Sequence, residues 1–242
     1  MKSAQPYQPL LLRILHGVTG LFLVAAILSA FWTYNTYDGR WGTLPLPRYE
    51  QIEGVHGTFG LYTLLIFPAF VLYAFQQGQQ RLAQANDVAK LTDQVGKPVW
   101  WHTLSRITNT VTLLALTFAL FSGKMMSEKW LPQGELDHFW YYGHLLSWVV
   151  MVVAISLHLL MNAKVGGLPF LLSMVTNKFR AQDSPRLWKN HITFWWSNLN
   201  LHSWSQGIRI ITQRPKLELV IWASLIAAWS ISLGKELWAL LP

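Results

Sequence analysis

Five stretches of the chain are almost wholly apolar, and polar or basic segments separate them. Each stretch holds about 20 residues or more, which at about 1.5 Å of rise per residue is enough to cross the hydrocarbon layer of a membrane. The pattern therefore predicts an all-α integral membrane protein with five membrane-spanning helices. The expected spans are about Leu10 to Tyr34, Gly54 to Phe75, Leu104 to Met125, Phe139 to Met161 and Leu217 to Leu237.

Two of the connecting segments are long. The first, QQGQQRLAQANDVAKLTDQVGK, is polar and is expected to leave the membrane. The second runs from Asn162 to Lys216 and contains GLPFLLSMVTNKFR and the tryptophan-rich NHITFWWSNLNLHSWSQGIRIIT. These two pieces are too short or too polar to span, and their mix of aromatic and basic residues is typical of interfacial helices. We therefore expect three units: a four-helix transmembrane bundle over residues 1–161, an interfacial segment over 162–216, and a fifth transmembrane helix with the C-terminus over 217–242.

The composition agrees with a membrane protein and excludes several kinds of site. Of the 242 residues, 52% are hydrophobic and 12% are charged, and the mean hydropathy is positive, at +0.27. The chain has no cysteine. Disulfides, iron–sulfur clusters and thiolate-bound metals are therefore excluded.

The basic residues report the orientation of the chain. The net charge of +8 indicates topology and attraction to membrane lipid, and we expect no nucleic-acid partner. With the N-terminus inside, 14 of the 19 Lys and Arg residues fall on the cytoplasmic side. The opposite side keeps Arg40, Arg48, Lys124, Lys129 and Lys235. The positive-inside rule therefore predicts a cytoplasmic N-terminus and a C-terminus on the opposite side of a plasma or thylakoid membrane.

Four histidines lie inside the first, second and fourth spans. His144 and His158 are 14 residues apart, which on a helix is about 21 Å and about 40° short of four whole turns. They therefore point from nearly one face at two depths. With the predicted orientation, His16 shares the inner leaflet with His158, and His56 shares the outer leaflet with His144.

Pairs of histidines without further protein ligands favour haem sites over zinc or non-haem iron sites. A zinc site usually takes at least three protein ligands, and a non-haem iron site normally includes a carboxylate. The porphyrin of haem supplies four equatorial nitrogens, so that the protein needs to supply only two axial ligands. We therefore expect two bis-histidine b-type haems, with His16, His56, His144 and His158 as axial ligands of the iron. Such centres have no open coordination position, which favours transfer of single electrons.

The same residues resemble a known family. The sequence RILH in the first span, HGTFG at the start of the second and the histidines 14 residues apart in the fourth are similar to the prokaryotic cytochrome b561 superfamily. This superfamily includes the dihaem cytochrome b subunits of nickel–iron hydrogenases and formate dehydrogenases. The resemblance covers about Leu10 to Met161. It implies a four-helix bundle around two haems, the four histidines as ligands, and electron exchange between the quinone pool and a redox partner protein.

Other residues have two interpretations each. Arg13, one turn before His16, is a candidate partner of a haem propionate and can equally be a topology marker. Arg106 in the third span, Arg48 and Lys124 are weaker propionate candidates, because Arg and Lys at helix ends usually extend to the membrane interface. Interfacial placement explains His102 and His138, with quinone binding or proton exchange as the alternative, and it explains His191 and His202, with a third cofactor as the alternative. Core packing explains four methionines, with a role as axial thioether ligands as the alternative: Met125, Met126, Met151 and Met161.

Three functions remain open from the sequence. The first is transmembrane electron transfer through two haems b, with quinol oxidation or quinone reduction at a haem edge as the activity if the protein is an enzyme. The second is a membrane anchor subunit of a larger redox complex, in which the tryptophan-rich segment contacts the partner. The third is a histidine-dependent proton or metal transporter, which would need acidic residues that the interiors of the spans lack.

Overall fold

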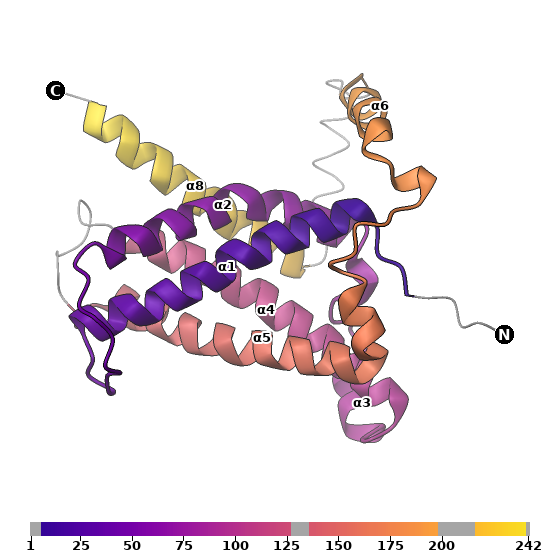
Figure 1. Cartoon of the computed structure of the whole chain (residues 1–242), viewed down its shortest axis with the longest axis horizontal. Coiled ribbons are helices and arrows are strands. Elements are labelled where there is room, and N and C mark those ends of the chain that lie inside the picture. Colours follow the sequence, from indigo (N-terminus) through magenta and orange to yellow (C-terminus); the bar gives the residue numbers. More distant parts are fainter. Residues whose placement is uncertain (1–5, 127–135, 198–215, 241–242) are drawn as a thin grey trace.

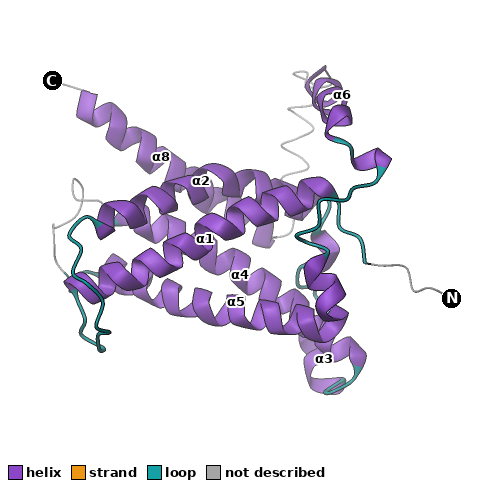
Figure 2. Ribbon diagram, viewed as in Figure 1, coloured by secondary structure: helices purple, strands orange, loops and turns teal. Residues whose placement is uncertain are grey.

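The structure is a computed structural model and describes residues 6–126, 136–197 and 216–240. All regular structure in these residues is helical (Figures 1 and 2). The long helices are α1 (Leu10–Tyr37), α2 (Ile52–Gln76), α4 (Pro98–Met125), α5 (Phe139–Leu172) and α8 (Lys216–Leu240). Shorter elements are η1 (Gln79–Arg81), α3 (Asp87–Asp93), η2 (Ala181–Asp183) and α6 (Pro185–Ser197).

Four of the long helices form a bundle. In Figure 1, α1, α2, α4 and α5 run side by side along the long axis of the molecule, with α3 at one end. Helix α1 packs mainly on α2, α4 packs mainly on α5, and α8 packs on α4. All five long helices are long and apolar enough to cross a membrane. The predicted all-α membrane fold with five spans is therefore confirmed.

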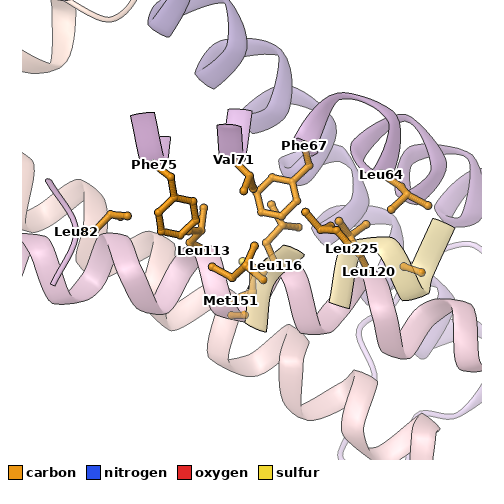
Figure 3. Packing of buried hydrophobic residues seen from close by; sticks show 13 residues of the cluster. Leu64, Phe67, Val71, Phe75, Leu82, Leu113, Leu116, Leu120, Met151 and Leu225 are labelled. Atoms are coloured by element: carbon orange, nitrogen blue, oxygen red, sulfur yellow. The ribbon is translucent and has the colours of Figure 1, made fainter. Parts of the chain in front are cut away.

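The core of the molecule includes the fifth span. Large apolar side chains of α2, α4, α5 and α8 form one buried cluster (Figure 3). Phe67 and Val71 of α2 are fully buried there, and so is Ile221 of α8. Helices inside lipid gain little from the hydrophobic effect, so van der Waals packing of this kind must hold them together. Helix α8 is therefore joined to the bundle by packing, while the division of the chain into three units stays a prediction.

Hydroxyl side chains of α4 are accommodated by their own helix. Thr110, Thr112, Thr117 and Ser122 each donate a hydrogen bond to the carbonyl oxygen four residues earlier, at 2.7 to 3.0 Å. A hydroxyl paired in this way has no unsatisfied donor, so that it can lie in an apolar environment at little cost. This is why α4 forms a span although its hydropathy is the lowest of the five.

The fourth span is longer than the sequence predicted. We expected it to end near Met161, but α5 continues to Leu172. The helix is broken at Gly167, whose φ of 65° lies in the left-handed region that glycine adopts most readily, and Pro169 follows. The expected interfacial piece, residues 167–180, therefore begins at the break in the helix. Only its first residues, up to Leu172, are helical, and they extend α5. Helix α6 lies apart from the bundle in Figure 1.

Candidate functional site

We call His16 and His158 the inner pair, and His56 and His144 the outer pair, after the orientation that the basic residues predict. The inner pair joins α1 to α5. The ring centroids of His16 and His158 are 6.0 Å apart, and the ring planes differ by 29°. Phe70 of α2 meets the His16 ring edge to face at 5.9 Å. Both imidazoles are partly buried. The fold therefore brings together two residues that are 142 positions apart in the chain.

The outer pair joins α2 to α5. The ring centroids of His56 and His144 are also 6.0 Å apart, with ring planes at 64°. Because His144 precedes His158 by 14 residues on the same helix, the two pairs are separated by about 21 Å along the bundle. The structure thus has two similar pairs at two depths.

The spacing within each pair matches an axial ligand pair. A bond between a metal ion and an imidazole nitrogen is about 2 Å long, and the ring centre lies about 1 Å beyond the nitrogen, so two rings in line across one ion have centres about 6 Å apart. Rotation of a ring about its bond to the metal leaves this distance unchanged. The different plane angles of the two pairs are therefore both compatible with axial ligation.

Hydrogen bonds fix the tautomer of three of these rings. The Nδ1 atom of His56 lies 3.0 Å from the carbonyl oxygen of Ala26, and that of His158 lies 2.7 Å from Oδ1 of Asn109. Both oxygens can only accept, so Nδ1 must carry the proton and donate. His144 Nδ1 lies 3.0 Å from the Ser122 hydroxyl, whose own proton goes to the Phe118 carbonyl. In all three rings this leaves the Nε2 lone pair free to bind a metal.

The surroundings of the inner pair also fit haem. Arg13 Nε and Thr19 Oγ1 are buried and have no hydrogen-bond partner, and they lie one turn before and one turn after His16. Such buried polar groups normally find partners, and the propionate carboxylates of a haem are acceptors. A Cβ added at Gly17 or Gly20 of the same helix would meet nothing within 4 Å. The residues present therefore fit a haem beside His16.

Both arginines expected at the propionates already bind protein groups. Arg13 donates to the carbonyl oxygens of Thr176 and Lys178, the latter at 2.8 Å. Arg106 donates to Oδ1 of Asp87 at 2.7 Å. Each guanidinium still keeps a buried Nε without a partner. Arg13 and Arg106 are thus held by the protein, and the buried Nε–H of each remains available to a further group.

The remaining candidates are at the surface, at a helix end or in the core. His102 is exposed, and His138 caps α5 by accepting a hydrogen bond from the Trp140 backbone N–H at 3.2 Å. Met151 and Met161 are buried in the core. Helix α6 includes His191, whose side chain is outside the described part of the chain, and His202 lies outside the described residues altogether.

The groups that orient the histidines were not predicted from the sequence. Asn109 and Ser122 are polar residues within the third span, and polar groups inside a span are functional candidates. That signal was present, but their partners could not be read from spacing along the chain. Asn162 also contacts this residue, because its Nδ2 donates a hydrogen bond to the backbone carbonyl oxygen of His158 at 2.6 Å.

A polar cluster closes the end of the bundle near the outer pair. Arg40 donates to Asp38 at 2.7 Å and to Asp137 at 3.1 Å, and Tyr141 donates to Asp38 at 2.7 Å. Burial raises the pKa of Asp38, but the hydrogen bonds from Arg40 and Tyr141 outweigh it and hold the pKa below the ordinary 3.8. The hydrogen bonds from Tyr142 and Arg40 likewise lower the pKa of Asp137. Both carboxylates are therefore charged at neutral pH.

Comparison with known proteins assigns the chain to a family. The family model described as Prokaryotic cytochrome b561 matches residues 7–177, which include all of α1, α2, α4 and α5. Comparisons with curated proteins and with solved structures gave no significant match. The family is one of helical membrane proteins in which haem b carries electrons across the membrane. Since the match covers well over half of the residues, the chain belongs to the prokaryotic cytochrome b561 family.

Proposed function

We propose that this protein holds two haems b and passes single electrons between them across the membrane. His16 and His158 bind the inner haem, and His56 and His144 bind the outer one. The observation that carries the proposal is the pair of 6.0 Å ring separations, each suited to two ligands on opposite sides of one iron, at two depths of the same bundle.

The residues of each pair determine the kind of chemistry. Bound haem supplies a one-electron iron couple. Two imidazoles fill both axial positions, which leaves none for oxygen or a substrate. The acceptors of the Nδ1–H groups hold the rings in place: Asn109 and Ser122 orient the two histidines of α5, and the Ala26 carbonyl orients His56. Arg13 and Arg106 each keep an Nε donor for a propionate.

The ends of this conduit are the places for exchange with other molecules. We propose that quinone, or quinol, exchanges electrons with one haem near a membrane interface, and that a redox partner protein exchanges them with the other. The excess of basic residues supports a cytoplasmic N-terminus, which places His16 and His158 in the inner leaflet. An additional role as the membrane anchor of a redox complex is compatible with this function.

A metal-transport function has less support. Among the described residues, no group of three or more His, Cys, Asp or Glu is placed to hold a metal ion. A transport path for a cation normally needs such polar or acidic groups inside the spans. The two histidine pairs have no acidic neighbour of this kind, and haem remains the ligand that needs only two protein groups.

Haem counting on single variants tests the proposal. In purified protein, His144→Ala should lose the outer haem and His158→Ala the inner one, so that each variant retains one haem where the wild type has two. Absorbance of the reduced pyridine adduct measures the haem content, and a redox titration shows which component is lost. His102→Ala is the matched control, because His102 is exposed on α4, and it should retain both haems. Two haems in either pair variant, or none in the wild type, would contradict the proposal.

A further inference from the structure

A small cavity lies at the end of the bundle that carries the inner histidine pair. It has a volume of about 250 Å³ and is lined by Gly96, Pro98, Trp101, His102, Lys164 and Val165. The first four of these residues belong to the start of α4 and the turn before it, and the last two to α5. The volume is below the 300–1,000 Å³ typical of pockets for drug-sized ligands. The cavity therefore suits a small group.

The lining of the cavity is cationic and aromatic. The Lys164 ammonium lies 5.3 Å from the centre of the Trp101 ring, which keeps the charge over the indole face. Lys164 and His102 are both exposed. In the part of the chain that the structure describes, the ion pairs involve other residues, and the first turn of α4 has no acidic residue. The site therefore has positive charge without a carboxylate to neutralise it.

The position of the cavity along the bundle is that of the lipid headgroups. Lys164 follows His158 by six residues, which places it about 9 Å further toward the same end. Trp100 and Trp101 lie together there, with ring centroids 4.6 Å apart. Tryptophan gathers at the headgroup level of membranes, where its ring is apolar and its N–H is polar. A ligand in the cavity would therefore lie at the membrane surface.

We propose that this cavity binds the phosphate group of an anionic phospholipid, whose headgroup carries no ammonium to repel Lys164. Lys164 supplies the charge that attracts the phosphate, His102 a second polar contact, and Trp101 the apolar wall against which the glycerol end of the lipid packs. Anionic lipid headgroups attract basic side chains at the membrane surface, which supports a lipid phosphate beside Lys164. The proposal does not depend on the haems, since none of the six lining residues belongs to either histidine pair.

Lipid retention in mixed nanodiscs tests this site. The wild-type protein is placed in nanodiscs of phosphatidylcholine with a minor share of phosphatidylglycerol, and native mass spectrometry measures which lipid stays bound. We expect preferential retention of phosphatidylglycerol, and a loss of about fivefold in that preference for Lys164→Gln. Trp101→Leu should also weaken it. The control Lys178→Gln, an exposed lysine outside the cavity, should keep the wild-type preference.

Two outcomes would overturn the proposal. Equal preference in Lys164→Gln and the wild type would show that the cavity does not bind the lipid. Displacement of phosphatidylglycerol by inorganic phosphate would show that the ligand is a soluble anion and not a lipid. The haem content of each variant, measured in parallel, separates these results from a folding defect. The haem content also shows whether the lipid site and the two haem sites are independent of each other.

Discussion

At the level of single residues, His144 has the most constrained position of the four histidines. Ser122 bonds to its Nδ1, and Gly123 lies directly against the ring. A Cβ at Gly123 would be 3.1 Å from Cε1 and 3.6 Å from Nδ1 of His144. Such a Cβ would be closer to the ring than ordinary van der Waals packing allows. The absence of a side chain at Gly123 therefore lets α4 approach the edge of the His144 ring.

Replacing this glycine should disturb one haem only. In Gly123→Ala the methyl group would push the His144 ring by a few tenths of an ångström, and we expect haem retention at the outer site to weaken about tenfold while the inner site is unchanged. Haem titration resolved by reduction potential measures both sites. The control Gly234→Ala adds the same methyl group to α8 where nothing lies within 4 Å. Equal effects on both haems would contradict the assignment of His144 to the outer site.

The histidines could be found from the sequence, but their partners could not. The 14-residue step in α5 follows from helix geometry alone, so that His144 and His158 are predictable as a set. Asn109 meets His158 across 49 positions, and this depends on the register between α4 and α5. The contact of Arg106 with Asp87 could not be predicted either, because Asp87 is 19 positions away in a polar segment, where no periodic pattern indicates contact.

At the level of elements, Arg13 connects the start of α1 to the segment that follows α5. The side chain is 5% exposed and donates to the Thr176 and Lys178 carbonyl oxygens. Tyr7 adds to the connection, because its hydroxyl donates to Asp183 and its ring lies 4.1 Å from the Arg180 guanidinium. Residues 176–183, which we call the inner strap, are therefore held against the helix that carries His16.

Loss of Arg13 should release the inner strap. A hydrogen bond from a charged donor contributes about 1.5–3 kcal/mol, so Arg13→Gln should speed hydrogen exchange of the strap amides by roughly tenfold to a hundredfold. Exchange in α4 should stay as in the wild type. Hydrogen–deuterium exchange read by mass spectrometry measures both regions. The exposed Arg48→Gln is the control. Unchanged exchange in the strap of Arg13→Gln would mean that these bonds do not hold it.

The apolar pattern predicted the helices better than their ends. All five spans are present, because about 20 apolar residues have few alternatives to a helix in lipid. The fourth span was predicted to end near Met161, before the break at Gly167, since a glycine with a proline two residues later fits either the end of a helix or a bend within one. The separate interfacial piece expected there is in part the extension of α5 to Leu172.

For the molecule as a whole, the polar cluster at the outer end ties distant parts of the chain together. Asp38 follows α1, Arg40 lies in the loop after it, and Asp137 and Tyr141 flank the start of α5. The Asp38 side chain is 3% exposed and Arg40 is 26% exposed. The cluster therefore joins the α1–α2 pair to the α4–α5 pair at one end of the bundle.

The pKa of Asp38 predicts how stability depends on pH. Because the folded-state pKa lies below 3.8, the carboxylate stabilises the fold above that pH, and the contribution is lost as the pH falls through the folded-state value. Asp38→Asn should lower the free energy of unfolding by about 1.5 kcal/mol at neutral pH. The free energy of unfolding should also fall less steeply in this variant as the pH is lowered. Thermal unfolding in detergent between neutral pH and pH 3 measures both. The exposed Asp93→Asn should behave as the wild type. An acid dependence unchanged in Asp38→Asn would contradict the expectation.

The separation of the two histidine pairs along α5 places a large share of the membrane voltage between them. About 21 Å of a hydrocarbon layer about 30 Å thick lies between them. An electron that passes from one depth to the other therefore crosses roughly two thirds of the membrane voltage, which amounts to about 1.5 kcal/mol per 100 mV. A membrane that is positive outside pulls electrons outward and opposes their inward flow. If each histidine pair holds a haem as we propose, the membrane voltage helps to determine which of the two irons is reduced.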